Sequence, residues 1–443
     1  GPHFISLIHN KHREPLMILA GKKAAYITLG CKLNFSETST IRHSLENAGV
    51  TTVDEKQGAD IFIINTCSVT DVAERKGRQI IRKIIHHNPD AYIVVVGCYA
   101  QLRAKELMQI EGVNLVLGAQ DKFKVEEYLR FCDERQKQEP HSCDIFKLGD
   151  FDLACSFGDR TRCFLKIQDG CDYFCSYCTI PFARGKSRSA TISQVVDTAR
   201  SVADKGIKEI ILTGVNTGDF GKGSEETFSD LIQALDKVEE INRFRISSIE
   251  PNLLTDEIIR FVATSSRFMP HFHIPLQSGS NDVLHLMKRR YTRELFAEKV
   301  RTIKTLIPDA FIGVDVIAGM RGENEQHFED ALAFISQLNI SRLHVFPYSE
   351  RQGTKALEIR GSVSPEEKHR RVEALLQISE QKLHNFYHQF IGKTRNVLFE
   401  DNNSNGKMGG FTDNYIRIEV PFNPAWANQI RPITLVSDLL SQD

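Results

Sequence analysis

The sequence predicts an α/β protein in three parts: an N-terminal doubly wound parallel α/β domain, a central (β/α)6 partial TIM barrel, and a small C-terminal all-β, OB-like module. Twice along the chain, short apolar runs rich in β-branched residues alternate with helical patterns, which is typical of parallel sheets covered by helices. After a helical pattern at 365–384, short strands of period two alternate with Gly- and Asn-rich turns. The 443 residues are too many for one ordinary core, so several domains are expected.

The first part is expected at 22–132. Its predicted strands are 25–29, 61–64 and 92–96, and its predicted helices are 36–48, 71–87 and 102–109. The strands are almost continuously apolar, as expected for parallel strands buried on both faces. A cysteine follows each strand closely: Cys31, Cys67 and Cys98. Because the carboxyl ends of parallel strands meet at one edge of a sheet, these three thiols can approach one another. Soft thiolates favour an iron–sulfur cluster, with zinc as the competing metal and three buried apolar cysteines as the alternative without metal.

The second part, expected at 157–383, begins with a cysteine-rich loop. Cys171, Cys175 and Cys178 have the spacing Cys-x3-Cys-x2-Cys. Three thiolates satisfy three irons of a cubane cluster and leave the fourth iron open, as a catalytic site requires. The predicted strands of the barrel are 164–168, 208–213, 244–249, 272–276, 311–317 and 342–346. Helical patterns separate these strands, including 193–205, 227–240 and 324–338.

Polar residues stand at the carboxyl ends of these strands, where barrel enzymes bind their ligands. They are Thr213, Asn216, Ser248, Glu250, Gln277, Ser278, Asp315 and Tyr348. Such side chains can hydrogen-bond a nucleoside and an amino-acid group, although each is also compatible with ordinary turn chemistry.

The third part is expected at 384–443, with strands at 395–399, 415–420 and 432–436. Small β-barrels of this kind often bind nucleic acid. A purely structural module is the alternative.

Composition narrows the function classes. The formal net charge is −1, so any RNA contact must come from local basic groups rather than a global field. The candidates for phosphate contact, each equally compatible with a solvated surface, are Arg184, Lys186, Arg188, Lys288, Arg289, Arg290 and Arg293. No run of eighteen apolar residues predicts a membrane span, and residues 1–15 lack the apolar segment of a secretory signal. Ten cysteines in such a chain indicate a reducing, cytoplasmic compartment, with Cys132, Cys143, Cys155 and Cys163 expected as free thiols.

Taken together, these motifs resemble the radical S-adenosylmethionine (SAM) methylthiotransferases over nearly the whole chain. The segments most similar to the MtaB branch of that family are 28–34, 97–101, 180–185, 273–280, 287–292 and 344–349. One segment departs from the family pattern. Arg321 stands where a proline is expected in 319–323, which leaves the geometry of that loop open.

The resemblance implies a radical SAM core with a [4Fe–4S] cluster on the loop cysteines. It also implies an auxiliary [4Fe–4S] cluster on the first three cysteines, adenine contact by Tyr177, and a C-terminal TRAM domain that binds RNA. The implied reaction adds a methylthio group to C2 of N6-threonylcarbamoyladenosine at position 37, in the anticodon loop of tRNA. Two SAM molecules are used per turnover, one as methyl donor and one as radical source. A monomer served by an electron donor such as flavodoxin is expected, and removal of the TRAM domain is expected to spare SAM cleavage.

Three alternatives stay open at this point. The other branches of the family act on isopentenyladenosine in tRNA or on an aspartate of a ribosomal protein. A non-catalytic, zinc-dependent RNA-binding protein is the alternative from a different class.

Overall fold

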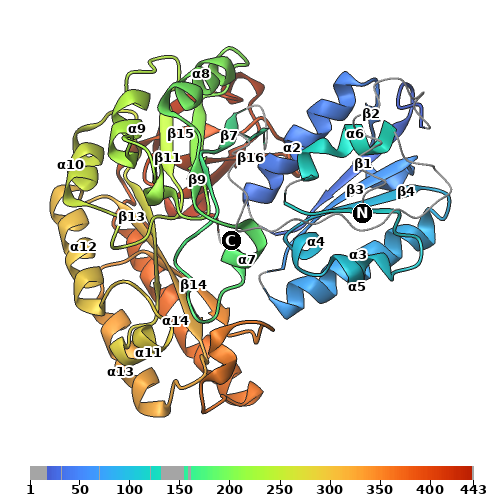
Figure 1. The fold of residues 1–443 in the computed structure, drawn as a ribbon. Helices are drawn as coiled ribbons and strands as arrows, with labels where there is room; N and C mark the ends of the chain where they lie inside the picture. Colours follow the sequence, from blue (N-terminus) through green and yellow to red (C-terminus); the bar gives the residue numbers. More distant parts are fainter. Residues whose placement is uncertain are drawn as a thin grey trace. The chain divides into compact units, whose positions relative to one another are not determined.

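The structure is a computed structural model that describes residues 17–30, 32–68, 70–119, 121–130 and 161–441, and the backbone of 154–157. The chain divides into two compact units (Figure 1). Unit 1 comprises 1–149, 154–156 and 179–186, and unit 2 comprises 150–153, 157–178 and 187–443.

Unit 1 contains a parallel sheet in the order β2-β1-β3-β4-β5. Its strands are β1 (Lys23–Thr28), β2 (Thr51–Thr52), β3 (Ile61–Thr66), β4 (Tyr92–Gly97) and β5 (Leu115–Leu117). The three strands predicted from the sequence are confirmed. The two added strands, β2 and β5, are short and lie at the sheet edges, where an apolar run is too brief to be recognised.

Helices cover both faces of this sheet (Figure 1). One face carries α2 (Lys32–Asn47) and α6 (Val125–Arg130); the other carries α3 (Asp71–His87), α4 (Cys98–Leu102) and α5 (Ala104–Met108). Alternate residues of β3 serve the two cores, since Ile61 and Ile63 belong to one apolar cluster and Phe62 and Ile64 to the other. The doubly wound prediction is confirmed. The predicted helix at 102–109 is interrupted at Arg103, where ψ of 41° leaves the helical region.

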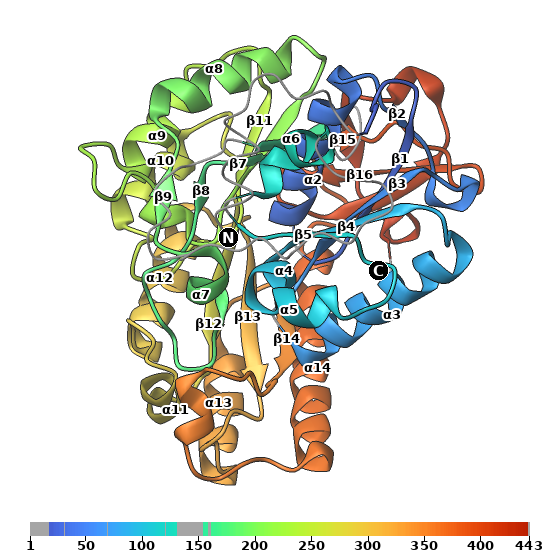
Figure 2. The same ribbon diagram turned by 45° about the vertical axis from the view of Figure 1, so that its right-hand side comes forward.

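Unit 2 contains the six parallel strands predicted for a partial barrel. They are β7 (Arg162–Lys166), β10 (Glu209–Thr213), β11 (Arg243–Ile246), β12 (His271–Gln277), β13 (Phe311–Ala318) and β14 (Arg342–Pro347). The strands form two groups, β7, β10 and β11 in one and β12, β13 and β14 in the other. An isolated parallel β-bridge between Ser248 and His273 joins the two groups. The helices α8 (Ile192–Ala203), α9 (Phe228–Leu235), α10 (Asp256–Thr264), α12 (Arg293–Leu306) and α13 (Glu325–Gln337) lie along the outer side of the strands (Figure 2).

Five short elements also occur between 154 and 286. They are β6 (Ala154–Phe157), β8 (Gln168–Asp169), α7 (Ile180–Arg184), β9 (Arg188–Ser189) and α11 (Asn281–Leu286). Of these, α7 belongs to unit 1 although it follows the cysteine loop directly in sequence.

The C-terminal residues form an antiparallel sheet in the order β17-β16-β15-β18. The elements are α14 (Pro365–His388), β15 (Thr394–Phe399), β16 (Lys407–Thr412), β17 (Arg417–Pro421) and β18 (Ile430–Thr434). The sequence does not predict the strand β16, because two adjacent glycines weaken its strand pattern. Its Gly409 leaves room for a guanidinium, since a Cβ there would lie 2.5 Å from Arg417 Nη2. The predicted boundary between 383 and 384 falls inside α14.

This C-terminal sheet packs on the amino-terminal ends of the barrel strands. Arg243 donates to the carbonyls of Asn396 and Phe411, at 2.9 and 3.1 Å. Arg245 donates to the carbonyls of Thr412 and Asp413, at 2.8 and 2.9 Å. Phe311, the first residue of β13, shares one apolar cluster with α14 and with the C-terminal strands. The barrel and the C-terminal sheet therefore have a common core.

Candidate functional site

In unit 1, the strand ends that lead into the three cysteines pack against one another. A Cβ added to Gly30 would lie 2.8 Å from Cys67 Cβ and 3.1 Å from Cys67 Sγ. One added to Gly97 would lie 2.6 Å from the carbonyl oxygen of Thr66. The residues before Cys31 and Cys98 thus contact the segment that ends in Cys67. Cys31 itself lies outside the described residues.

Replacing Gly97 with alanine is expected to lower the free energy of unfolding by about 3 kcal/mol or more. Its φ of +103° and ψ of −164° are nearly restricted to glycine, and the new methyl group would meet the backbone of Thr66. Gly21→Ala is the matched control, because Gly21 also has a positive φ but has no atom within 4 Å of an added Cβ. Urea unfolding measures both variants. Equal losses would contradict the close contact at Gly97.

Buried charges surround Cys67 and Cys98. Arg184 of α7 donates to Glu37 Oε1 at 2.8 Å and to Asn34 Oδ1 at 2.6 Å, and Lys122 also forms an ion pair with Glu37. Burial raises the pKa of the Cys98 thiol to about 11, while the nearby Arg184 opposes that shift. The raised pKa keeps this thiol protonated at neutral pH, so a metal that bound it would have to displace the proton.

Arg184 corrects one prediction. Its guanidinium is 3% exposed and paired with a buried carboxylate, so it does not face RNA phosphates. The sequence did not distinguish it from an exposed arginine, because its partner lies 147 residues away.

In unit 2, the cysteine loop is fixed by backbone contacts. Ser176 N–H donates to the carbonyl of Met287 at 3.0 Å, and its hydroxyl donates to the carbonyl of Leu286 at 2.7 Å. Phe174, inside the motif, has a positive φ of 37°, a strained conformation for a side chain of this size. Cys171, Cys175 and Cys178 are half-buried and form no disulfide, and burial raises the pKa of Cys171 to about 11. The loop is thus a rigid, partly open frame with three sulfur donors.

The chemistry of these thiols bears on the choice of metal. The loop thiols are soft donors, and three of them fit an iron–sulfur cluster with one iron left open or a zinc ion with a fourth ligand from elsewhere. Within the described residues, three potential metal-binding atoms lie within 4.8 Å of one another in one place, at His273, Asp315 and His344.

Arg289 lies against this loop and also corrects a prediction. It was expected to hold phosphate, yet its side chain is 4% exposed and forms an ion pair with Glu250. One guanidinium nitrogen donates to Cys175 Sγ at 3.1 Å and to the Tyr177 hydroxyl at 3.4 Å. Its Nε donates to the Tyr291 hydroxyl at 3.1 Å.

Polar atoms at the carboxyl ends of the strands are buried without partners. Four residues have buried side-chain atoms with no hydrogen-bond partner among the described residues. The atoms are Thr213 Oγ1, Asn216 Oδ1 and Nδ2, Gln277 Oε1 and the Tyr348 hydroxyl. Leaving such groups unsatisfied costs about 1–3 kcal/mol each, so in native proteins they are normally paired with a ligand or with ordered water. Gln277 also has a positive φ of 68°, next to a register shift in β12. These four residues fit a polar ligand such as SAM.

Ser278, another predicted cofactor residue, already has a partner, because its hydroxyl accepts from Ser280 N–H at 3.1 Å. At Ser248 the backbone carbonyl accepts from the Thr217 hydroxyl. Neither residue is among those whose buried polar side-chain atoms lack a partner.

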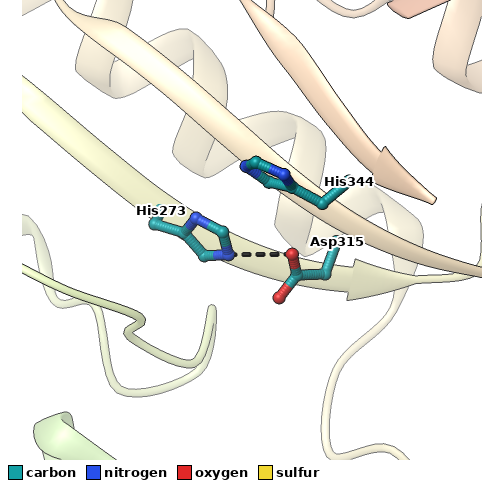
Figure 3. A group of neighbouring side chains, drawn as sticks. All are labelled: His273, Asp315 and His344. Carbon is teal, nitrogen blue, oxygen red and sulfur yellow. Dashed lines mark ion pairs between the residues drawn. The ribbon is translucent and has the colours of Figure 1, made fainter. Parts of the chain in front are cut away.

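Asp315, also predicted to bind the cofactor, belongs to a group that the sequence did not reveal. His273 Nε2 lies 2.8 Å from Asp315 Oδ1, and the ring of His344 stacks on that of His273 with 5.0 Å between ring centroids and an interplanar angle of 24° (Figure 3). The three residues come from β12, β13 and β14. Because the rings are stacked, their nitrogen lone pairs do not converge, and a metal ion would require one ring to rotate.

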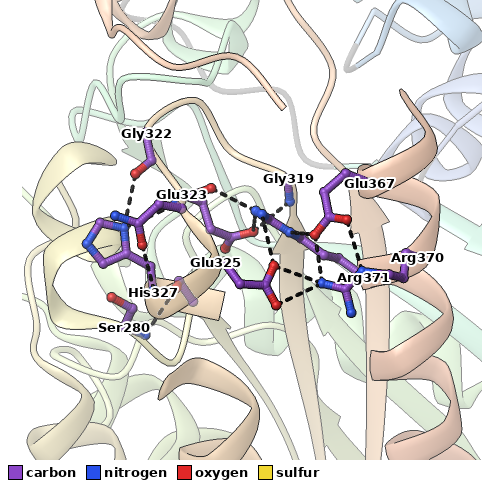
Figure 4. Close-up of polar contacts among 11 residues, drawn as sticks. Ser280, Gly319, Gly322, Glu323, Glu325, His327, Glu367, Arg370 and Arg371 are labelled. Atoms are coloured by element: carbon purple, nitrogen blue, oxygen red, sulfur yellow. Dashed lines mark hydrogen bonds and ion pairs between the residues drawn. The ribbon is translucent and has the colours of Figure 1, made fainter. Parts of the chain in front are cut away.

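The loop that contains Arg321 is held without the proline of the family pattern. Arg321 donates to Glu350 at 2.7 Å and to the carbonyl of Ile359 at 3.1 Å. Glu323 accepts from Gly319 N–H at 3.0 Å and pairs with Arg371 of α14 at 3.0 Å (Figure 4). Ion pairs therefore replace the conformational restriction that proline would supply.

The remaining basic candidates divide by exposure. Arg188 is largely buried and pairs with Asp169 at 3.6 Å, and Arg293 pairs with Asp330 at 2.9 Å. Lys186, Lys288 and Arg290 are exposed. These three are the side chains best placed to meet an external anion.

The unassigned cysteines lie mostly outside the described side chains. Cys132, Cys143 and Cys155 fall there, so the free-thiol prediction is not tested for them. The same prediction is wrong for Cys163, which is disulfide-bonded. No helix in the described part of the chain is long and apolar enough to cross a membrane.

Comparison with known proteins gives consistent matches. The family described as "Radical SAM superfamily" matches residues 165–335, and "Uncharacterized protein family UPF0004" matches residues 23–118. The chain is 40% identical to "Threonylcarbamoyladenosine tRNA methylthiotransferase MtaB" of Bacillus subtilis, over 89% of each chain. It is 32% identical to "tRNA-2-methylthio-N(6)-dimethylallyladenosine synthase" of Clostridium novyi, over 87% of each chain.

Among solved structures, the chain is similar to the radical SAM methyltransferase TsrM from Kitasatospora setae. The TM-score is 0.54 at 14% identity, covering 74% of this chain and 73% of that one. This likeness concerns the fold.

Proposed function

Because the chain belongs to the family of MtaB threonylcarbamoyladenosine tRNA methylthiotransferases, we propose that it adds a methylthio group to C2 of N6-threonylcarbamoyladenosine at position 37 of tRNA. The 40% identity over 89% of both chains carries this proposal. The unsatisfied polar atoms at the carboxyl ends of the barrel strands support it, because the reaction needs a bound nucleoside cofactor there.

Two sets of thiols would hold the metal groups. Cys171, Cys175 and Cys178 would hold one [4Fe–4S] cluster, and Cys31, Cys67 and Cys98 would hold a second. The first would supply reducing power for the cleavage of SAM, and the second would supply a place for the sulfur that is transferred. One SAM is the radical source and a second is the methyl donor.

The chain's own residues bind and orient the cofactor. Thr213, Asn216, Gln277 and Tyr348 offer hydrogen bonds at the strand ends, and burial excludes water from them. Tyr177, next to Cys178, contacts the adenine. The target base enters from a single-stranded loop, where extrusion costs least.

The proposed partners follow from this reaction. The enzyme is a cytoplasmic monomer that receives electrons from a donor such as flavodoxin. Its N-terminal domain spans 22–132, its barrel begins near 157 and ends with α14 at His388, and the C-terminal module follows. Lys186, Lys288 and Arg290 contact tRNA phosphates, and the C-terminal TRAM domain adds further RNA contacts.

Anaerobic turnover with three tRNAs tests the substrate. We expect methylthio product with tRNA carrying threonylcarbamoyladenosine, and at least a hundredfold less with isopentenylated or unmodified tRNA. A site that hydrogen-bonds polar substituents leaves its own groups unpaired when they are missing. Mass spectrometry of digested tRNA measures the product.

Two results would contradict the proposal. Equal product from isopentenylated tRNA would move the chain to the other tRNA branch. Product found on a ribosomal-protein aspartate would move it to the protein-modifying branch.

A further inference from the structure

Arg289 is held rigidly beside a metal-binding sulfur. Its guanidinium donates to Cys175 Sγ at 3.1 Å and Nε donates to Tyr291 at 3.1 Å, while Glu250 takes the other end of the guanidinium. The Tyr291 hydroxyl is itself fixed, since it donates toward the carbonyls of Pro275 and Leu276 at 3.0 and 2.7 Å. With 4% of the side chain exposed, the cation cannot move into solvent without breaking all these contacts.

A charge fixed in this position acts on an electron transfer. Adding one electron to a cluster on Cys171, Cys175 and Cys178 makes its net charge more negative by one unit, and no covalent bond forms or breaks in that step. A nearby cation stabilises the more negative form more strongly, and an N–H donated to a ligand sulfur does the same. Burial of the guanidinium keeps water from screening this interaction.

We infer that Arg289 sets the reduction potential of the radical SAM cluster, acting as a positioning and charge-compensating residue through its hydrogen bond to Cys175. Its ion pair with Glu250 limits the effect, since the carboxylate favours the oxidised form. The inference rests on the proposed function only for the presence of a cluster on the three loop cysteines.

The neighbouring Arg290 provides a matched control. It is exposed, its guanidinium stacks on the ring of Tyr173 at 4.0 Å, and it donates to the carbonyl of Asp172 at 3.3 Å. It lies one residue away and carries the same charge, but it is exposed, so water screens its field.

The test is an anaerobic redox titration of the cluster without SAM or tRNA. A full-length chain with Cys31, Cys67 and Cys98 replaced by alanine serves as the background, so that one cluster contributes to the electron paramagnetic resonance signal. With dithionite as the one-electron donor, Arg289→Met is expected to reduce the ratio of reduced to oxidised cluster at least tenfold at a given potential. That ratio corresponds to a midpoint lower by about 59 mV.

Companion variants fix the interpretation. Arg289→Lys keeps a cation, so its midpoint potential should lie between that of Arg289→Met and that of the parent. Glu250→Gln removes a negative charge and should raise the midpoint potential. Arg290→Met should leave the midpoint potential unchanged. If Arg289→Met does not retain four irons, Glu250→Gln and Arg289→Lys carry the test. An unchanged midpoint in Arg289→Met, or equal shifts in Arg289→Met and Arg290→Met, would overturn the inference. Absence of methylthio product in turnover assays would instead overturn the proposed function, and the titration would be unaffected.

Discussion

Replacing Cys175 with alanine is expected to abolish reductive cleavage of SAM, lowering deoxyadenosine formation by at least a thousandfold. Two thiols of the loop cannot hold a cluster that needs three, and Arg289 would lose its sulfur acceptor. Cys67→Ala is expected to behave differently. It removes a thiol of unit 1 and leaves the loop of unit 2 unchanged, so deoxyadenosine should still form while the methylthio product disappears. Chromatography of the anaerobic reaction measures both products.

The iron content of each protein is the control for the Cys175→Ala and Cys67→Ala variants. The parent chain should approach eight irons after anaerobic reconstitution, and either variant should retain about half. Loss of deoxyadenosine in Cys67→Ala alone would show that the two cysteine sets have exchanged roles. Zinc in place of iron, without visible absorption, would restore the non-catalytic alternative.

Removing residues 389–443 is expected to unfold the barrel as well as the C-terminal sheet. Arg243 and Arg245 would lose the carbonyls that accept their hydrogen bonds, and the cluster around Phe311 would be exposed to water. Each Å² of apolar surface newly exposed to water costs about 25 cal/mol, and a typical domain has only about 5–15 kcal/mol in total. SAM cleavage should therefore disappear with the fold, contrary to the expectation from the sequence. Thermal unfolding followed by circular dichroism measures the loss.

Point variants separate this structural role from RNA binding. Arg245→Met leaves Glu209, 2.7 Å away in the parent, without that ion pair, and should lower the free energy of unfolding by about 3–5 kcal/mol. Exposed Lys407 and Arg431 lie on the C-terminal sheet, so replacing both with alanine should preserve SAM cleavage. If they bind tRNA, the slope of log affinity against log salt should fall by about one for each phosphate that is no longer neutralised. A truncated chain with full SAM cleavage would show that the barrel does not need the common core.

Features that depend on neighbouring residues in the sequence could be predicted, whereas contacts between residues far apart in the sequence could not. The runs at 61–64 and 92–96 are long and apolar enough to specify buried strands, and both are confirmed. The contacts of Arg184 and Arg289 were not predictable, because Glu37 and Glu250 lie 147 and 39 residues away from them. Periodicity reports which residues face a core, but it does not distinguish an arginine paired with a buried carboxylate from one that faces water. The group formed by His273, Asp315 and His344 was missed for the same reason.

The common core of barrel and C-terminal sheet also bears on synthesis of the chain. A ribosome releases the N-terminal residues first, and translation of the last sixty residues takes roughly 3–12 s at ordinary elongation rates. During that interval Arg243, Arg245 and Phe311 lack the partners that emerge last. Unit 1 ends at 186, so all of its residues are synthesised before the C-terminal sheet that shares a core with the barrel. The barrel is therefore the part of the chain that must wait longest for its packing partners.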